Sequence, residues 1–315
     1  MFDELGNRMK AYEKIMQQRF LPLLPIVARI DGKAFHSWTL GLEKPFDQDM
    51  IQIMQNTTKR LVEETNACIG YTQSDEISLV FYSENLNSQI FFDGKIFKLN
   101  SVLASMATAY FARSIEDKLD EVFNYSFEDD PAIFKEAEKK IDLLMSKPPA
   151  LFDCRVWQVP TKEEVCNYLI WREADAVRNS IQSAGQAYFS HTSLQGKNQN
   201  EIQEMLFQEK NINWNDYSVA EKRGTYFQKK KIKREFTTDE IDKLPEKHHA
   251  RIYPHFEVER TDIQILNMSR FTQLANRVEV VFDGVEPKYK SISMGACVEN
   301  SNCELPPAKA GGFLL

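Results

Sequence analysis

The sequence predicts an α+β fold in which helices pack on an antiparallel β-sheet, and three observations support this. Short runs of apolar and β-branched residues alternate with longer segments whose apolar residues recur at helical spacing. Two of the short runs are separated by only a few polar residues, which is typical of a hairpin. The chain has 315 residues, 43% of them hydrophobic, which is enough for a large core and about two domains.

The first 120 residues contain the clearest elements. A helix over 3–20 precedes the run LPIVARID, which predicts a buried strand ending at Asp31. An amphipathic helix follows over 47–66 and begins at an N-capping aspartate. The runs ACIGYTQ and ISLVFY then predict a hairpin with a charged tip. We also expect a strand pair around Asp93-Gly94 and a helix over 101–119.

The rest of the chain is expected to be helical first and β-rich later. The helical part contains, in order, an insertion over 120–150, a short strand over 153–159, and helices over 162–190 and 198–209. From residue 237 onward, runs such as RIYPHFEVER and RVEVVF read as short strands. We therefore expect a small β-rich extension over 236–290 and a flexible tail over 291–315.

Composition and charge exclude several classes of protein. No apolar stretch approaches the roughly 20 residues that span a bilayer, and the opening MFDELGNRMK has no signal-peptide character. Five scattered cysteines are an odd number in a chain too large to need disulfide bonds. We therefore expect a cytoplasmic protein with reduced thiols and no membrane partner. The formal net charge of −7 gives no overall attraction for a polyanion.

Carboxylates stand at the ends of two predicted strands. Asp31 ends the first strand, and Asp75 and Glu76 lie in the hairpin, so neighbouring strands would bring Asp31 and Asp75 together. Carboxylates held that close repel each other unless cations lie between them. Mg²⁺ suits such oxygen ligands, and two ions about 4 Å apart serve phosphoryl and nucleotidyl transfer. The spacing alone fits an ordinary solvated turn as well, and both interpretations stay open.

Cationic residues near these carboxylates are candidates for steadying a triphosphate. They are Arg29, Lys33 and Lys44. By contrast, His36 is expected to be a packing residue, and Trp157 and Trp171 lie in apolar patterns that predict core positions.

Five motifs occur in order along the chain: RIDGKAFHSW, GLEKPFD, YTQSDEISLVF, FDCRVW and YLIWREADAVRNS, followed by LQGKN and INWNDY. In these motifs the chain resembles the tRNA-histidine guanylyltransferase superfamily, whose members add nucleotides to RNA in the 3′-to-5′ direction. The resemblance spans roughly residues 20–230. It implies a polymerase palm-like sheet with a ferredoxin-like βαββαβ core and helices on one face. It also implies a catalytic domain over 1–235 that includes a helical RNA-binding part.

The resemblance also implies roles for single residues. Asp31, Gly32 through its carbonyl, and Asp75 would hold two Mg²⁺ ions, with Glu76 beside them as a catalytic group. Nucleotide contacts would come from Arg29, Lys44, Ser74 and Asn179. Asp153 and Arg155 would lie near the site.

One departure from the family pattern concerns specificity. Where the guanylyltransferases proper have the run His-Ile-Asn-Asn-Leu-Tyr-Asn, this chain reads VRNSIQS over 177–183, so only Asn179 is kept. Val177 replaces the histidine and can neither bind a phosphate nor exchange a proton. The chain is therefore more similar to the guanylyltransferase-like branch that repairs truncated 5′ ends. Arg178 is a candidate to supply the lost phosphate contact.

A basic strip over 222–234 interrupts the otherwise acidic chain. Seven of its thirteen residues are Lys or Arg and none is acidic. Such a strip predicts either an RNA track or an edge strand covered with lysines, and the two are equally compatible with the pattern. The RNA-binding candidates are Lys222, Arg223, Lys229, Lys230, Lys231 and Lys233.

The resemblance implies a template-dependent 3′-to-5′ nucleotidyltransferase that repairs truncated tRNA 5′ ends. ATP or GTP would activate the RNA 5′ end, and the 3′-hydroxyl of an incoming nucleotide would then attack it, with two Mg²⁺ ions assisting. The alternatives are a tRNA(His) guanylyltransferase, a palm-type nucleotide enzyme without RNA, and a non-catalytic RNA-binding protein. The resemblance further implies a homotetramer and a tRNA or tRNA-like partner.

Overall fold

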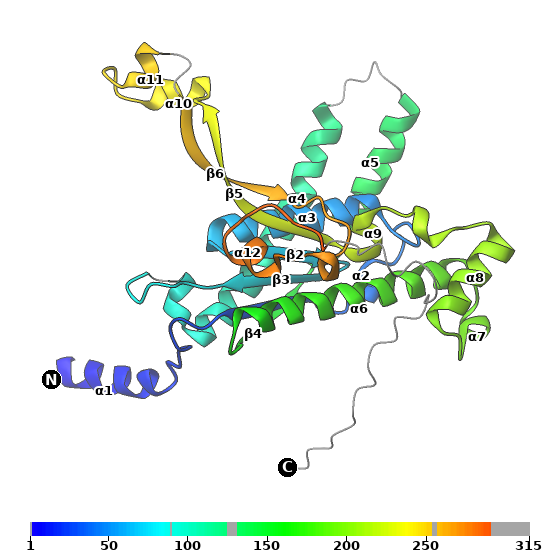
Figure 1. Ribbon diagram of the computed structural model, residues 1–315, viewed down its shortest axis with the longest axis horizontal. Coiled ribbons are helices and arrows are strands. Elements are labelled where there is room, and N and C mark those ends of the chain that lie inside the picture. Colours follow the sequence, from blue (N-terminus) through cyan, green and yellow to red (C-terminus); the bar gives the residue numbers. More distant parts are fainter. Residues whose placement is uncertain (1, 89, 125–130, 254–256, 291–315) are drawn as a thin grey trace.

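The computed structural model describes residues 2–88, 90–124, 131–253 and 257–290 (Figure 1). A six-stranded antiparallel sheet with the order β4-β1-β3-β2-β5-β6 forms its centre. The strands are β1 (Ile26–Gly32), β2 (Ile69–Gln73), β3 (Glu76–Phe81), β4 (Phe152–Gln158), β5 (Thr225–Glu235) and β6 (Glu257–Ile265). The expected α+β fold is confirmed, and the order β4-β1-β3-β2 is that of the ferredoxin-like core.

Helices cover both faces of the sheet rather than one. On one face, α3 (Gln48–Thr65) and α4 (Ile96–Asn124) pack on alternate strand residues such as Ile30 and Leu79. On the other, α6 (Lys162–Tyr188) packs on the intervening residues such as Val27 and Val80. Successive strand side chains point to opposite faces, so the continuous apolar strand runs follow from this two-sided burial.

The remaining helices are short or project from the sheet. They are α1 (Phe2–Ile15), α2 (Phe35–Trp38), α5 (Pro131–Met145), α7 (His191–Leu194), α8 (Gln199–Lys210), α9 (Val219–Arg223), α10 (Thr238–Lys243), α11 (His249–Ile252) and α12 (Arg277–Phe282), with 3₁₀ turns η1 (Phe91–Gly94), η2 (Trp214–Asp216) and η3 (Phe271–Gln273). In Figure 1 α1 extends away from the body, and α10 and α11 lie at the tip of a β5–β6 arm. No helix among the described residues has the length and apolar character needed to cross a membrane.

Helix α3 illustrates how the sequence sets an element that borders the site. The Asp47 side chain accepts a hydrogen bond from the Met50 amide at 3.0 Å, as expected for an N-cap. The helix ends at Asn66, which adopts the left-handed conformation that terminates many helices. Its buried face includes Ile53, Met54 and Leu61. This packing holds the N-terminus of α3 against the end of the sheet that carries the carboxylates.

Two expected β elements are helical in the structure. Around Asp93-Gly94 there is no strand pair: the 3₁₀ turn η1 leads directly into α4. The run RVEVVF forms α12, because the adjacent residues Val280 and Val281 are both buried, which a helix stripe allows and a half-exposed strand does not. Of the segment expected to be a β-rich extension, β6 is the one strand in the described residues, and it pairs with β5 across the expected boundary at residues 235–236. The expected tail over 291–315 lies outside the described residues.

Candidate active site

A cavity of about 560 Å³ opens at the end of the sheet where β1 and the β2–β3 turn meet. Its near wall carries Asp31, Gly32, Ser74 and Asp75. Its other walls come from the loop that precedes α3, from α3 itself, from the end of α6 and from α9. The residues contributed there include Lys44, Phe46, Gln55, Ser183, Gln186 and Glu221. The cavity therefore lies between Asp31 and Asp75 on one side and a mixed polar wall on the other, where amides and hydroxyls stand beside charged groups such as Lys44 and Glu221.

Backbone geometry brings Asp31 and Asp75 to the same wall. The Gly32 amide donates to the Asp75 carbonyl at 3.1 Å, which ties the end of β1 to the β2–β3 turn. Ser74 has a φ of 54°, and this left-handed residue makes the turn tight enough to present Asp75. The Ser74 hydroxyl donates to the Asp75 carboxylate at 3.1 Å. The predicted proximity of the two aspartates thus has a structural basis in the turn.

The two carboxylates repel each other in the chain alone. Burial and, to a smaller extent, the neighbouring Asp31 raise the pKa of Asp75 above its usual range. A cation between the two aspartates would offset both the repulsion between their charges and the loss of hydration that burial causes. The donor set fits a divalent ion that keeps several oxygen ligands from water and phosphate, as Mg²⁺ does. Among the described residues no three His, Cys, Asp or Glu side chains form a complete metal site, so the nucleotide would have to complete it.

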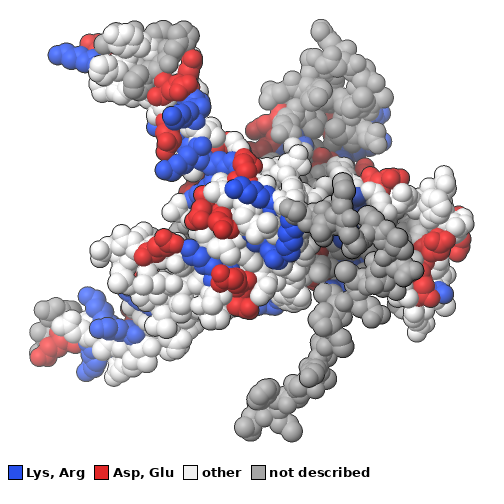
Figure 2. All heavy atoms as spheres, in the orientation of Figure 1, with Lys and Arg blue, Asp and Glu red and all other residues white. Residues whose placement is uncertain are grey.

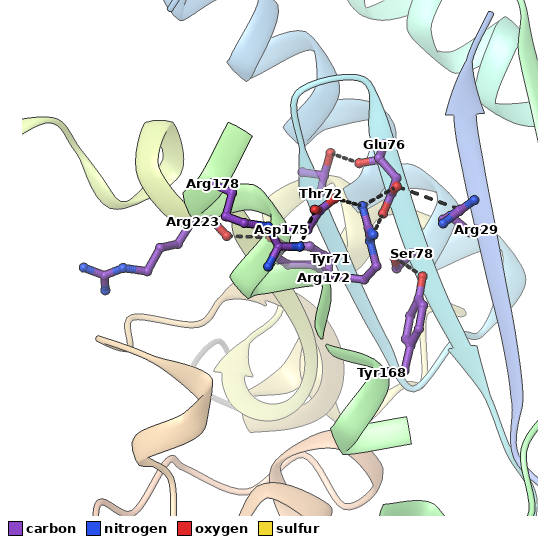
Figure 3. Close-up of polar contacts among 10 residues, drawn as sticks. All are labelled: Arg29, Tyr71, Thr72, Glu76, Ser78, Tyr168, Arg172, Asp175, Arg178 and Arg223. Carbon is purple, nitrogen blue, oxygen red and sulfur yellow. Dashed lines mark hydrogen bonds and ion pairs between the residues drawn. The ribbon is translucent and has the colours of Figure 1, made fainter. Parts of the chain in front are cut away.

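Glu76 does not line the cavity with Asp31 and Asp75. It lies in an ion-pair network on the α6 face of the sheet (Figure 3). The Arg172 guanidinium donates to both Glu76 carboxylate oxygens, at 2.6 and 2.8 Å. Arg172 also donates to Asp175 at 3.0 Å, and Asp175 accepts from Arg178 at 2.6 Å. Burial raises the pKa of Glu76, and Arg172 partly offsets this effect. The ion pair ties α6 to β3, and Glu76 is not among the residues that line the cavity.

Only some of the residues expected to contact the nucleotide line the cavity. Lys44 and Ser74 line the cavity, as does Gly32, while the exposed Lys33 uses its amide to donate to the Leu151 carbonyl at 2.8 Å. Arg29 and Arg178 belong instead to the network around Glu76, where Arg29 Nε lies 3.9 Å from the Glu76 carboxylate. Asn179 is an exposed residue of α6 that does not line the cavity.

A row of acidic residues crosses three strands beside the cavity. Asp31 is register-paired with Glu76 on β3 and with Asp153 on β4. Directly opposite residues of antiparallel strands have side chains on the same face, with Cβ atoms roughly 5 Å apart. Two residues before Asp31, Arg29 is register-paired with Arg155. Arg155 forms an exposed ion pair with Asp153 at 3.6 Å. Asp153 and Arg155 therefore lie on the edge strand β4, beside Asp31, and do not line the cavity.

The basic strip is divided by the structure. Lys222 is buried, with its amine donating to the Asn215 carbonyl, and Arg223 donates to the Ser269 carbonyl. Lys229, Lys230, Lys231 and Lys233 lie on β5, whose partner β6 supplies acidic residues. Lys231 pairs with Glu259 at 3.3 Å, and Lys230 pairs with Glu286. Figure 2 accordingly shows positive and negative side chains interleaved along the arm rather than a positive track.

Several residues of the site were not found from sequence. Arg172 lies 96 residues from its partner Glu76, and no local pattern links them. Ser183, Gln186 and Ala187 line the cavity from one face of α6, and their three- and four-residue spacing was the available signal. His36, expected to be a packing residue, is exposed and lines the cavity close enough to Asp75 to lower its pKa slightly.

Asp75→Asn is expected to raise the melting temperature of the metal-free protein by about 2 °C or more. The pKa of Asp75 is raised in the fold, so its ionised form at neutral pH costs stability that the neutral amide does not. The gain should vanish as the pH falls and Asp75 takes up a proton. Thermal unfolding in a chelator, at neutral and acidic pH, measures this.

The same experiment with Mg²⁺ tests the fit of the metal. Wild type should gain about 1.4 kcal/mol at a Mg²⁺ concentration about ten times its Kd, whereas Asp75→Asn should gain much less. Asp283→Asn changes an exposed carboxylate distant from the cavity and is the matched control. A Mg²⁺ response that is equal in all three proteins would contradict a site at Asp75.

The chain is similar in sequence to several known proteins. A family model described as tRNA(His) guanylyltransferase matches residues 6–160. A probable tRNA(His) guanylyltransferase of Drosophila melanogaster is 28% identical over 239 residues, which cover 70% of this chain and 73% of that protein. The tRNA(His) guanylyltransferase of Schizosaccharomyces pombe is 28% identical over 240 residues, covering 72% and 81%.

Two solved structures are also similar. A bacterial tRNA(His) guanylyltransferase-like protein in complex with ATP superposes with a TM-score of 0.61 and 38% identity, covering 71% of this chain and 88% of that one. A bacterial tRNA(His) guanylyltransferase-like protein in complex with GTP gives a TM-score of 0.58 and 30% identity, covering 85% and 93%.

Proposed function

The chain belongs to the tRNA(His) guanylyltransferase family of nucleotidyltransferases, and we propose that it adds nucleotides to the 5′ end of a tRNA. The observation that carries this proposal is the pair Asp31 and Asp75 on the wall of a cavity of nucleotide size. The curated relatives from fly and fission yeast are named for guanylate addition to tRNA(His), which makes that reaction the first candidate. The second candidate is the repair of truncated 5′ ends, the reaction expected from the sequence.

The proposed reaction has two steps. An oxygen of the RNA 5′-monophosphate attacks the α-phosphorus of ATP or GTP, and pyrophosphate leaves. The 3′-hydroxyl of the incoming nucleoside triphosphate then attacks the activated 5′ phosphorus, and the nucleoside monophosphate leaves. Bound Mg²⁺ would lower the pKa of the attacking hydroxyl and spread the developing charge.

This chain's own residues would bind and orient the reactants. Asp31, Asp75 and the Gly32 carbonyl would hold the metal, and Lys44 and Ser74, on the cavity wall, would contact the triphosphate. The amide and hydroxyl groups of Gln55, Ser183 and Gln186, which also line the cavity, offer donors and acceptors to a base or ribose. The location in the cytoplasm and the homotetramer stay predictions that accompany this proposal.

The second candidate is favoured by one observation on α6. By the resemblance, Val177 stands where the guanylyltransferases proper have a histidine. It is partly buried and packs against the cluster that includes Ile181 and Trp214. The neighbouring Arg178 is tied to Asp175 and offers its remaining donors to solvent. A site that lacks the histidine would rely on base pairing with the template to select the nucleotide.

A single-nucleotide extension assay separates the candidates. The substrates are 5′-monophosphorylated, labelled tRNA(His) without its extra guanylate and a tRNA lacking its first nucleotide, each with Mg²⁺, ATP and one nucleotide at a time. We expect guanylate addition to tRNA(His) under the first candidate. Restoration of whichever nucleotide complements the opposite strand in the truncated tRNA would support repair. Absence of addition to both RNAs would overturn the proposed function.

A further inference from the structure

Three aromatic side chains form a ladder on α6 and β4, beside the Glu76 network. Trp157 meets Tyr168 edge to face, with ring centroids 5.4 Å apart, and Tyr168 lies 6.0 Å from Trp171. Tyr168 is held in place by a hydrogen bond of 2.7 Å between its hydroxyl and Ser78. Trp171 was expected in the core, yet it is 49% exposed, whereas Trp38 and Trp214 are buried. The ladder therefore ends in an indole that is half exposed and in contact with an ordered neighbour.

The Trp171 ring is supported from one side. The guanidinium carbon of Arg172 lies 4.4 Å from the ring centroid. Arg172 is itself fixed by its two bonds to Glu76 and one to Asp175. The ring therefore stays oriented while part of its surface is exposed. Stacking a planar ligand against it would cost little side-chain conformational entropy.

This aromatic surface is separate from the nucleotide cavity and near the acidic row. Trp171 does not line the cavity. It is linked to the carboxylates through Arg172, which contacts the Trp171 ring and binds Glu76. Glu76 is in turn register-paired with Asp31. Cations lie nearby on the same two elements. Arg178 belongs to the same helix, and Arg155, on β4 two residues from Trp157, keeps a half-exposed side chain.

We propose that Trp171 is a stacking platform for an unpaired nucleobase at the 5′ end of the RNA substrate, with Arg155 and Arg178 contacting the adjoining phosphates. This inference rests on the proposed function. Aromatic platforms flanked by cations are how proteins hold single-stranded RNA without reading its sequence. The platform would leave the cavity to the nucleoside triphosphate and bring the RNA end to the carboxylates from the α6 side.

Three substitutions at Trp171 test the platform by extension kinetics. Trp171→Ala should raise the KM for the RNA about tenfold, because stacking contributes roughly that factor or more per base, with the KM for ATP unchanged. Trp171→Phe should keep most of the affinity. Trp171→Leu covers Arg172 without offering an aromatic face, and it should behave like alanine. Phe207→Ala removes a similarly exposed aromatic residue from α8 and is the matched control.

Tryptophan fluorescence gives a readout that does not need catalysis. Binding of a 5′-monophosphorylated tRNA transcript should quench the emission of wild type and of Phe207→Ala, and the quenching should be largely lost in Trp171→Phe. Addition activity with an RNA KM unaffected by all three Trp171 substitutions would overturn the platform. Absence of addition by wild type, with quenching intact, would instead overturn the proposed function and support the platform.

Discussion

Asp31→Asn and Asp75→Asn are each expected to lower the rate of nucleotide addition by about 10³-fold or more. Both carboxylates line the cavity. Each variant would lose a charged ligand of the metal while keeping the shape of the side chain. Metal stabilisation of the developing charge accounts for several kcal/mol of the barrier, and each 1.4 kcal/mol corresponds to a tenfold change in rate. Single-turnover extension at saturating Mg²⁺ and nucleotide measures the effect.

The controls distinguish lost chemistry from lost folding. Both variants should unfold at or above the wild-type temperature, since each removes one charge from a repelling pair. Asp283→Asn, remote from the cavity, should extend RNA at the wild-type rate. An Asp75→Asn protein that retains more than a tenth of the activity would exclude Asp75 as a metal ligand.

Arg172→Met is expected to destabilise the fold by about 3 kcal/mol and to lower the melting temperature by about 6–10 °C. Arg172 and Glu76 are mostly buried, and removing one partner leaves the other charge without compensation in a desolvated place. Glu76→Gln should cost less, because an amide still accepts a hydrogen bond from the guanidinium. Denaturant or thermal unfolding at neutral pH measures both.

A double-mutant cycle separates the positioning role from a catalytic one. Glu76→Leu with Arg172→Met should be more stable than the sum of the single losses, because no lone buried charge remains. The double variant should also recover part of the activity lost by Arg172→Met. If stability recovers but addition stays absent at the level of Asp75→Asn, Glu76 takes part in the chemistry, contrary to its position in the structure.

The elements around Asp31 and Asp75 could be predicted because local patterns determine them. The order β1-α3-β2-β3 follows from three local patterns. They are a β-branched run ending in Asp-Gly, a capped amphipathic helix, and two apolar runs joined by four polar residues. The metal-binding roles came from resemblance, and the structure adds that both aspartates face one cavity.

The ion pair of Glu76 with Arg172 could not be predicted, because it joins residues far apart in sequence. In the motif Ser-Asp-Glu the two acidic residues look equivalent, yet alternation along β3 turns Glu76 toward Arg172 on α6. The lysines of the basic strip gave the same difficulty. The acidic partners of these lysines come from distant parts of the chain, since Lys231 pairs with Glu259 on β6 and Lys230 pairs with Glu286. A local count of charges therefore could not separate an RNA track from an edge strand covered with lysines. Trp171 looked like a core residue because exposure is not visible in an apolar pattern.

The length of β5 sets how far the arm reaches. Its eleven residues span about 36 Å at the usual rise of a strand. Thr225 at one end lines the cavity, and Glu235 at the other leads to α10. Each rung of the β5–β6 ladder is paired in simple register, so removing opposite residues two by two shortens the ribbon without turning any side chain to the other face. The first four residues of β5, 225–228, are buried, and the later residues are partly exposed. Shortening the outer part of the arm is therefore expected to leave the geometry of the cavity unchanged.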